Sequence, residues 1–290
     1  GLVRVRPPET IVAVANVGDD VELHGLHISP DLDTITYTVA GAIDPDRGWG
    51  LAGETWRAME ALGRYPSERA WFNLGDQDLA THLYRTDRLR AGATLTEVTA
   101  EIVASWGLRL RLLPVTDDAI RTMVTVRDGG EIGFQEYFVQ RRHDVEVERI
   151  RFHGAEEARP APGVLRALHD AERVVIAPSN PLVSIDPVIA VPGVRAALAA
   201  RRDAVVAVSP IVAGAALKGP ADRLLREMGH DASVVGIARL YAPFAATLVV
   251  DTADAAAADR VEAEGLRCVV APTIMTGPVE AAALAEVVLA

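Results

Sequence analysis

Acidic side chains are concentrated in three short segments between residues 19 and 78. These segments are Asp19-Asp20, Ser29-Pro30-Asp31-Leu32-Asp33-Thr34 and Gly75-Asp76-Gln77-Asp78. Mg²⁺ in proteins is normally held by one or two carboxylates together with water and substrate phosphates. For any single position the alternative is a helix cap or a turn, because Asp is common in both. The combined pattern predicts a divalent-cation site.

Two basic side chains follow the third acidic segment. His82 and Arg85 lie three residues apart near the start of an expected helix, so they share one of its faces. The helix dipole favours anions, not cations, at that end. We therefore expect this pair to bind a phosphate or to pair with the acidic cluster. A plain surface ion pair is the alternative.

Small and polar residues mark the expected strand-to-helix junctions of the second half. They are Ser179-Asn180-Pro181 with Ser184, Ser209-Pro210, and Lys218-Gly219-Pro220. Backbone N–H groups approach an anion closely at such junctions, and helix N-termini favour negative charge. Lys218, the only lysine of the chain, suits a phosphate contact. A solvated surface lysine is the alternative.

The elements that carry these segments alternate between strand and helix. Short apolar runs predict strands at Ile11 to Ala15, Arg173 to Ala177, Ala204 to Val208, Ala246 to Val250 and Arg267 to Val270. Helical patterns occur at Gly53 to Leu62, Thr94 to Trp106, Val164 to Ala171, Val194 to Ala200 and Ala221 to Met228. This alternation of strands and helices predicts an α/β fold with a doubly wound, Rossmann-like and mostly parallel sheet. The loops that bind ligand are then expected along one edge of that sheet.

The pattern changes between residues 115 and 152. Apolar and polar residues alternate in Met123 to Arg127 and in Val145 to Glu148, and the turn-forming Asp128-Gly129-Gly130 lies between them. Alternation with a period of two and a glycine turn predict antiparallel strands that include a hairpin. We therefore expect a small β-rich unit inserted into the parallel-sheet core.

These patterns divide the chain into two units. The Rossmann-like α/β core is expected over residues 1–113 and 160–290, and the β-rich insert over residues 114–159. On the insert, Gln135-Glu136 and Arg141-Arg142 are expected to be ordinary strand surface.

Composition excludes several classes of protein. The 290 residues include 40 acidic and 29 basic side chains. The resulting net charge of −11 argues against general electrostatic binding of nucleic acid. One cysteine, Cys268, excludes an internal disulfide and a cysteine-built zinc site. No apolar run approaches the about 18–20 residues that span a membrane, and no secretory signal opens the sequence, so we expect a cytoplasmic protein. Residue chemistry thus predicts an α/β enzyme that handles a phosphorylated or nucleotide ligand with Mg²⁺.

Many of the same segments resemble the 2-phospho-L-lactate transferase family. The resemblance covers almost the whole chain and is specific, because long strings agree in order and spacing. The matching strings are Asn16-Val17-Gly18-Asp19-Asp20, His24-Gly25-Leu26, Ser29-Pro30-Asp31-Leu32-Asp33-Thr34, Tyr37-Thr38, Asp46-Arg47-Gly48-Trp49-Gly50, Glu54-Thr55, Leu74-Gly75-Asp76-Gln77-Asp78-Leu79-Ala80-Thr81-His82, Arg85-Thr86, Phe134-Gln135-Glu136, Ala177-Pro178-Ser179-Asn180-Pro181, Ser184-Ile185, and Val208-Ser209-Pro210-Ile211-Val212-Ala213-Gly214 with Lys218-Gly219.

The resemblance implies a step in the biosynthesis of coenzyme F-420. Such enzymes take a guanosine diphospho-activated three-carbon acid and move its phospho-acid unit to the ribityl hydroxyl of the deazaflavin Fo. GMP leaves, and Mg²⁺ is required. The acid stays open between 2-phospholactate, phosphoenolpyruvate and 3-phosphoglycerate, with bacterial relatives pointing mostly to phosphoenolpyruvate. The resemblance also implies a homodimer.

The family pattern assigns roles to individual residues. It implies metal contacts for Asp19 and Asp31, and contacts with the deazaflavin for Asp33 and Asn73. The Ser179-Asn180 loop and the loop that ends at Lys218 are implied to face the guanosine nucleotide. Asp33 and Asp19 are the expected catalytic residues, and the full expected substrate-binding set is Asp33, Asn73, Asp76, His82, Arg85, Ser179, Asn180 and Lys218.

One feature of the family pattern is not found in this sequence. Relatives begin with a strand and a Gly-Gly-x-Gly-Gly type loop that binds phosphate, ahead of the strand that corresponds to Ile11. We expect that the sequence, which starts at Gly1, begins downstream of that loop, and loss of the loop is the alternative. Two other functions compete with the transferase. One is a non-catalytic nucleotide-sugar-binding regulator of the same fold. The other is a nicotinamide dehydrogenase, which is disfavoured because no Gly-x-Gly-x-x-Gly follows a strand.

Overall fold

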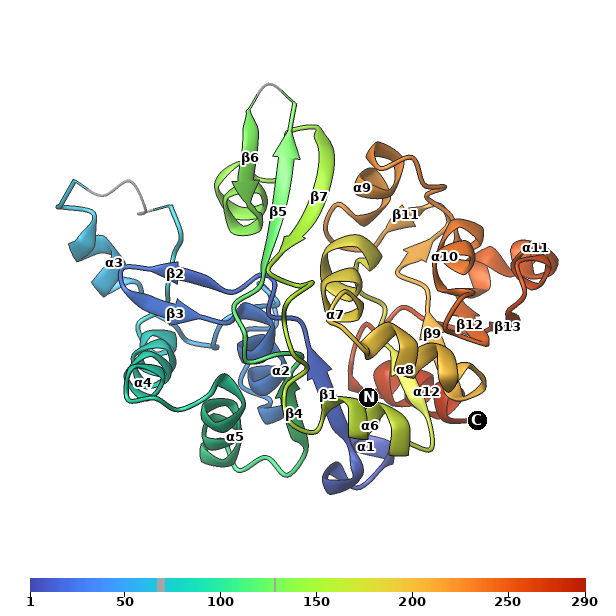
Figure 1. Ribbon diagram of the computed structural model, residues 1–290, viewed down its shortest axis with the longest axis horizontal. Helices are drawn as coiled ribbons and strands as arrows, with labels where there is room; N and C mark the ends of the chain where they lie inside the picture. Colours follow the sequence, from blue (N-terminus) through green and yellow to red (C-terminus); the bar gives the residue numbers. More distant parts are fainter. Residues whose placement is uncertain (67–70, 128) are drawn as a thin grey trace.

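The parallel strands of this α/β protein form two sheets. The computed structural model describes residues 1–66, 71–127 and 129–290. In the first half, β1 (Val12–Ala15) pairs with β4 (Arg111–Pro114) as a two-stranded parallel sheet (Figure 1). A four-stranded parallel sheet in the order β13-β12-β9-β8 forms the second half. Its strands are β8 (Val174–Ile176), β9 (Val205–Val208), β12 (Thr247–Val250) and β13 (Arg267–Val270). The predicted α/β class is confirmed, with its parallel strands divided between two sheets.

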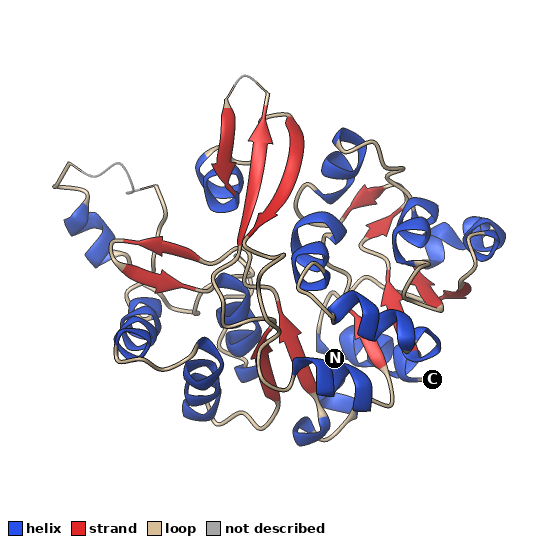
Figure 2. Ribbon diagram, viewed as in Figure 1, coloured by secondary structure: helices blue, strands red, loops and turns tan. Residues whose placement is uncertain are grey.

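Burial explains why the second-half strands read as unbroken apolar runs. Every residue of β9 and β12 is buried, whereas the edge strand β13 is partly exposed. Strands covered on both faces need apolar side chains in both directions. Helices surround this sheet (Figure 2). They are α6 (Val164–Asp170), α7 (Asp186–Ile189), α8 (Val194–Ala200), α9 (Ala221–Glu227), α10 (Val234–Tyr241), α11 (Ala258–Ala263) and α12 (Pro278–Leu289), and α12 also contacts the short α1 (Leu2–Val5).

Helices of the first half follow the predicted patterns with one shortened exception. Thr94 caps α5 (Leu95–Ser105) in a reciprocal capping box with Glu97, which confirms the helix expected there. The helix expected from Gly53 is limited to α3 (Arg57–Leu62), because Gly53 is left-handed, with a φ of 72°, and the next residues form a loop. Besides the short α1, the described residues of the first half also form the helices α2 (Pro30–Ala40) and α4 (Asp78–Arg90).

The predicted β-rich unit is a three-stranded antiparallel sheet. Its strands are β5 (Arg121–Val126), β6 (Gly130–Gly133) and β7 (Val147–His153), in the order β6-β5-β7, and they stand at the top of Figure 1. Asp128, at the predicted hairpin turn, lies outside the described residues. Two small hairpins complete the strands: β2 (Val21–Leu23) with β3 (Leu26–Ile28), and β10 (Ile211–Val212) with β11 (Ala215–Ala216).

Over the described ranges, no single helix combines the length and apolar character needed to cross a membrane. One pair, Pro181–Ile189 with Val194–Ala200, passes that test together, but the two parts meet at an angle of 91°.

Candidate active site

A cavity of about 970 Å³ collects residues from the first half, the insert and the second half. Its size is that of a typical site for a drug-sized ligand or cofactor. Arg85 and Asp76 are not among its lining residues. The predicted site residues that do line it are Asp19, Asp31, Asp33, Asn73, His82, Ser179, Asn180 and Lys218.

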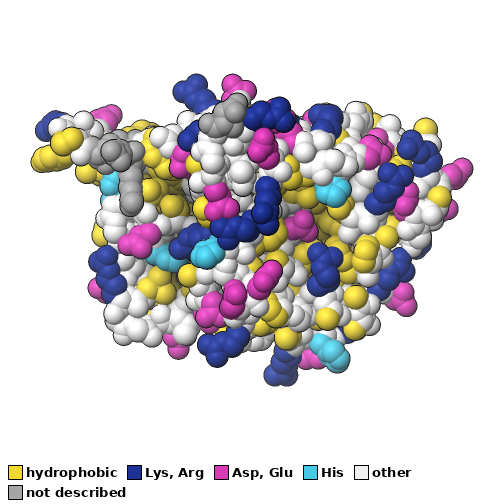
Figure 3. All heavy atoms as spheres, turned by 45° about the horizontal axis from the view of Figure 1, so that its top comes forward, with side chains coloured by type: hydrophobic (Ala, Val, Ile, Leu, Met, Phe, Trp, Pro, Cys, Tyr) yellow, Lys and Arg dark blue, Asp and Glu magenta, His cyan; other side chains and the backbone are white. Residues whose placement is uncertain are grey.

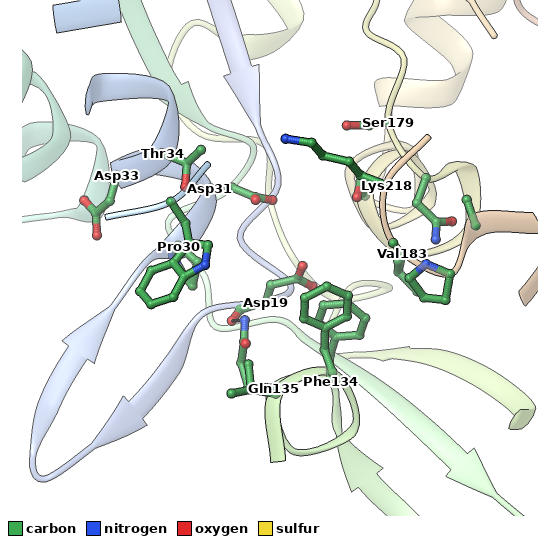
Figure 4. A pocket seen from close by; sticks show the side chains of 18 of the residues that line it. Asp19, Pro30, Asp31, Asp33, Thr34, Phe134, Gln135, Ser179, Val183 and Lys218 are labelled. Atoms are coloured by element: carbon green, nitrogen blue, oxygen red, sulfur yellow. Dashed lines mark hydrogen bonds between the residues drawn. The ribbon is translucent and has the colours of Figure 1, made fainter. Parts of the chain in front are cut away.

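Asp19 and Asp31 are turned toward the same part of the cavity (Figure 4). Asn16, the first residue after β1, ties their two segments together. Its Nδ2 donates to Asp31 Oδ2 at 3.0 Å, and its Oδ1 accepts from the N–H of Gly18 at 2.7 Å. Asn16 itself is buried. The strand end therefore positions both carboxylates with one side chain.

The electrostatics of this pair favour a bound cation. Burial raises the pKa of Asp19 well above its usual range, and the nearby charge of Asp31 raises it further. Burial likewise raises the pKa of Asp31 to about 6. Within the described residues, Asp19 Oδ1 is buried with no hydrogen-bond partner. The buried carboxylate of Asp19, with its unpaired oxygen, and the half-buried carboxylate of Asp31 form a hard-oxygen donor set that fits Mg²⁺.

A second buried cluster lies between α2 and α4. Asp33, Asp78 and His82 offer atoms within 4.8 Å of one another, which is the spacing of a possible metal site. However, the Arg85 guanidinium bonds to both carboxylate oxygens of Asp33. Burial raises the pKa of Asp33, while the charges of Arg85 and His82 oppose that shift. Because a cation already compensates Asp33, the Asp19–Asp31 pair is the better candidate for Mg²⁺.

Asp76 stabilises a helix end. Its Oδ2 accepts from Thr55 Oγ1 and from the N–H of Arg57 at 3.1 Å, and its Oδ1 accepts from the N–H of Ala58 at 3.0 Å, at the start of α3. Glu54 does the same for α4 by accepting from the backbone N–H groups of residues 77 and 78, at 2.9 and 2.8 Å. The two segments therefore cap each other's helices.

Gly75 is required for that exchange. A Cβ at Gly75 would collide with the Glu54 carboxylate. The sequence Gly75-Asp76 therefore serves the local helix ends, and its two acidic oxygens are already engaged there. The prediction that Asp76 contacts substrate remains a prediction.

The second half faces the cavity with small residues and one cation. Asn180 Oδ1 accepts from the N–H of Leu182 at 3.0 Å and so begins the turn that follows β8. Lys218 extends across the cavity from the second-half side, toward the side that carries Asp31 (Figure 4). Its Nζ lies 3.5 Å from the position of a Cβ on Gly48, so it reaches the first half of the chain. Lys218 has no ion-pair partner in the described part of the chain, which leaves its charge for a ligand.

The insert contributes more than the sequence indicated. Gln135 is only 9% exposed, lines the cavity and donates from Nε2 to the backbone oxygen of Asp19 at 3.0 Å. The expectation of ordinary strand surface was therefore wrong for Gln135. The physical reason is that residues 136–140 form a single π-helical turn rather than a strand, which turns the preceding side chain inward. Glu136 pairs with Arg141, as a surface residue would.

Apolar and aromatic side chains form the rest of the wall and were missed as site residues. On the face shown in Figure 3, hydrophobic side chains gather in the hollowed parts, and basic and acidic side chains alternate around them. The aromatic residues come from segments far apart in the sequence, so no local pattern joins them. Those that line the cavity are Tyr37, Trp49, Trp71, Phe72, Phe134 and Phe138.

Asn16 was also missed, and Asp78 was placed in an acidic segment but was given no role of its own. Asn16 follows β1 directly, and that position at a parallel strand end was the available signal. Asp78 lines the cavity and lies four residues before His82, so their spacing on one helix face was the signal.

The fold and the site define a Rossmann-like α/β enzyme with a carboxylate pair at a strand end and a lysine opposite. A family model, 2-phospho-L-lactate transferase CofD, matches residues 1–274. The chain belongs to this 2-phospho-L-lactate transferase family, which makes it a phosphotransferase of coenzyme F-420 biosynthesis.

Curated relatives support the same assignment. A phosphoenolpyruvate transferase from Streptomyces griseus is 44% identical over 99% of this chain and 91% of its own length. A protein of the same name from Nocardia farcinica is 43% identical over 96% of this chain and 86% of its own length. Another from Mycolicibacterium smegmatis is 42% identical over 94% of this chain and 85% of its own length.

A solved structure shares the fold at much lower identity. The crystal structure of a UPF0052 family protein from Bacillus halodurans aligns with a TM-score of 0.59 and 14% identity, over 100% of this chain and 94% of that one. This likeness concerns the fold alone.

Proposed function

We propose that the protein transfers a phosphoenolpyruvyl unit from a guanosine diphospho-activated donor to the ribityl hydroxyl of deazaflavin Fo, with release of GMP and a requirement for Mg²⁺. The hydroxyl oxygen forms a bond to the phosphorus that carries the acid. The bond from that phosphorus to the bridging oxygen of the diphosphate breaks, GMP leaves with the electron pair, and the hydroxyl proton is lost. The observation that carries the proposal is the Asp19–Asp31 pair on one side of the cavity with Lys218 opposite it.

The residues of the two halves suit different parts of this reaction. Asp19 and Asp31 would hold the cation, which would neutralise charge on the donor diphosphate. Lys218 adds a positive charge from the other side, and the Ser179-Asn180 loop offers small polar groups to the nucleotide. Because phosphoryl transfer depends mainly on positioning and charge neutralisation, this arrangement can supply most of the catalysis.

Asp33 is the candidate for the acceptor side. It lines the cavity and lies apart from the Asp19–Asp31 pair in Figure 4. A carboxylate there can accept a hydrogen bond from the attacking hydroxyl and orient it. With Asn73 and the aromatic wall, it marks the region in which we place Fo.

The choice of acid rests on the relatives. Proteins at 42–44% identity carry the name phosphoenolpyruvate transferase, which favours phosphoenolpyruvate over 2-phospholactate and 3-phosphoglycerate. Substrates that differ by a few atoms are separated by few pocket contacts, so the acid has to be identified from the product.

The test is a titration of Fo fluorescence with purified protein and Mg²⁺, followed by addition of each guanosine-activated acid. We expect saturable Fo binding, GMP release and a product whose mass identifies phosphoenolpyruvate as the acid. Binding of Fo without turnover of any donor would overturn the transfer reaction. A folded protein that binds guanosine nucleotide but not Fo would instead support the nucleotide-sugar-binding regulator.

Two further expectations belong to this proposal: the enzyme is a homodimer, and it works in the cytoplasm. The first is checked by light scattering on the purified protein. A mass of twice 30.9 kDa is expected, and a monomer that is fully active would contradict it.

A further inference from the structure

Arg85 lies behind Asp33 as seen from the cavity. Asp33 lines the cavity, whereas Arg85 does not and is 1% exposed. Arg85 Nη1 donates to Asp33 Oδ2 at 3.1 Å, and its Nη2 donates to Asp33 Oδ1. This two-pronged contact fixes both the position and the plane of the carboxylate, because the guanidinium is itself planar.

The guanidinium is held by a further row of buried groups. Arg85 Nη1 also donates to His82 Nδ1 at 3.3 Å and to the backbone oxygen of His27 at 3.4 Å. On the other side of the ring, His82 Nε2 lies 3.3 Å from Asp78 Oδ2. Tyr37 donates to Asp78 Oδ1 at 2.6 Å.

The sequence spacing explains why these groups meet. Asp33 and Tyr37 are four residues apart on α2, so they share a face of that helix. Asp78, His82 and Arg85 recur at intervals of four and three on α4 and share one of its faces. The two faces are joined by the Arg85–Asp33 and Tyr37–Asp78 contacts at the two ends of this row.

We infer that Arg85 is a positioning residue of the transfer reaction, which acts by holding the Asp33 carboxylate in the orientation that accepts the acceptor hydroxyl. Each Asp33 oxygen uses one lone-pair direction on the guanidinium and retains another for a ligand. The inference rests on the proposed function and replaces the expected contact between Arg85 and substrate. Because the Arg85 guanidinium is buried behind Asp33 and donates to both carboxylate oxygens of Asp33, it acts on the reaction through that residue.

The first experiment compares Arg85→Lys with Arg88→Lys. Lys keeps the charge but not the two-pronged geometry. Arg88 is the matched control, because it lies one turn further along α4 and pairs with Glu101 at the surface. We expect Arg85→Lys to lower kcat about tenfold while the KM for the donor changes less than about twofold. Arg88→Lys should leave both constants within about twofold of the wild type.

A double-mutant cycle with Asp33→Asn tests whether Arg85 acts through Asp33. We expect Asp33→Asn alone to lower turnover about tenfold or more. The double variant Asp33→Asn, Arg85→Lys should then be no slower than Asp33→Asn, because the group that Arg85 orients is already altered. Two losses that multiply would show that Arg85 acts independently, and this would overturn the inference.

Folding is measured separately from turnover. Circular dichroism and titration of active sites with Fo give the folded, binding-competent fraction, and kcat is expressed per folded site. An Arg85→Lys protein with a normal kcat per folded site would make Arg85 merely structural and overturn the inference. In that case wild-type transfer still stands, whereas a wild type without transfer would overturn the proposed function and this inference together.

Discussion

Asp19 and Asp251 both follow the end of a parallel strand, yet the two halves of the molecule use them differently. In the first half, burial and the charge of Asp31 raise the pKa of Asp19, and its Oδ1 has no partner among the described residues. In the second half, burial also acts to raise the pKa of Asp251, but hydrogen bonds from the backbone of Ala253 and Thr273 lower it. A carboxylate whose oxygens are satisfied by nearby backbone N–H groups shapes a loop, whereas a buried carboxylate with one unpaired oxygen is available to a ligand.

The same contrast extends across the cavity. The first half brings buried carboxylates, which need a cation, and the second half brings Ser179, Asn180 and the cation Lys218. Loops at the second-half strand ends are closed by short contacts of their own, such as Ser209 Oγ with the backbone N–H of Ile211 at 3.1 Å. A diphosphate between a cation held by one half and a lysine from the other would be neutralised from both sides.

The largest loss of activity is expected from Asp31→Asn, which removes one carboxylate of the Asp19–Asp31 pair in the first half. Asn keeps an oxygen to accept from Asn16 but removes the charge that attracts the cation. We expect turnover to fall about hundredfold or more and the Mg²⁺ concentration for half-maximal rate to rise. Asp251→Asn is the matched control, because the Asp251 carboxylate accepts hydrogen bonds from backbone N–H groups. Equal losses of Mg²⁺ dependence in the two variants would refute the distinction between them.

Lys218→Met tests the basic half of the comparison and should have a smaller effect. Met keeps most of the apolar stem and removes the charge. We expect the KM for the guanosine-activated donor to rise about tenfold, with the dissociation constant for Fo unchanged. Arg226→Met is the control, because Arg226 pairs with Asp222 at the surface of α9. Steady-state kinetics and Fo fluorescence measure the two constants, and an unchanged donor KM would make Lys218 a solvated lysine.

The elements and their order could be predicted from the sequence because they depend on local patterns. The strand near Ile11 and the helix capped by Thr94 follow from the spacing of apolar residues and from one capping residue. The convergence of Asp19 and Asp31 on one cavity was expected from the family resemblance. The rule that parallel strand ends share an edge applies to Asp19 alone, because Asp31 lies in the first turn of α2, after the antiparallel β2–β3 hairpin. Even the division of the parallel strands between two sheets leaves that convergence intact.

The partners of individual polar side chains could not be predicted. Arg85 faces Asp33 across 52 positions of sequence, and Gln135 reaches the backbone of Asp19 across 116. Such contacts depend on how α2 packs on α4 and on how the insert is placed, which no single segment encodes. Asp76 shows the same limit at shorter range, since an acidic residue beside a helix start is read equally well as a cap or as a ligand.

The stability of the metal-free protein and the extra stability given by Mg²⁺ should change in opposite directions with pH. The pKa of Asp31 is raised to about 6 in the folded protein, so near pH 5 the folded state binds a proton that the unfolded chain largely releases. Stability of the metal-free protein therefore rises as pH falls through about 6. Mg²⁺ requires the ionised carboxylate, so the increase in Tm that it causes should shrink over the same range.

Asp186 provides the control for this pH experiment. Burial also raises its pKa to about 6, so it adds to the pH response of the metal-free protein. Asp186→Asn should weaken that response and leave the effect of Mg²⁺ on Tm intact, while Asp31→Asn should remove the effect of Mg²⁺. Melting curves at pH 5, 6 and 7.5, each with and without Mg²⁺, give the answer. A Mg²⁺ effect that grows toward pH 5 would contradict the assignment.

The smallest effect on catalysis is expected from Asp76→Asn, although Asp76 lies in one of the three acidic segments of the family pattern. Its oxygens accept from Thr55, Arg57 and Ala58 at the start of α3, and it does not line the cavity. An amide keeps one acceptor and loses the other, so we expect Tm to fall by about 2 °C and kcat to stay within about twofold. Glu54→Gln should behave alike, because Glu54 serves α4 in the same way. A tenfold loss of kcat at unchanged Tm would contradict this prediction. It would support the expected contact between Asp76 and substrate and show that the carboxylate does more than cap α3.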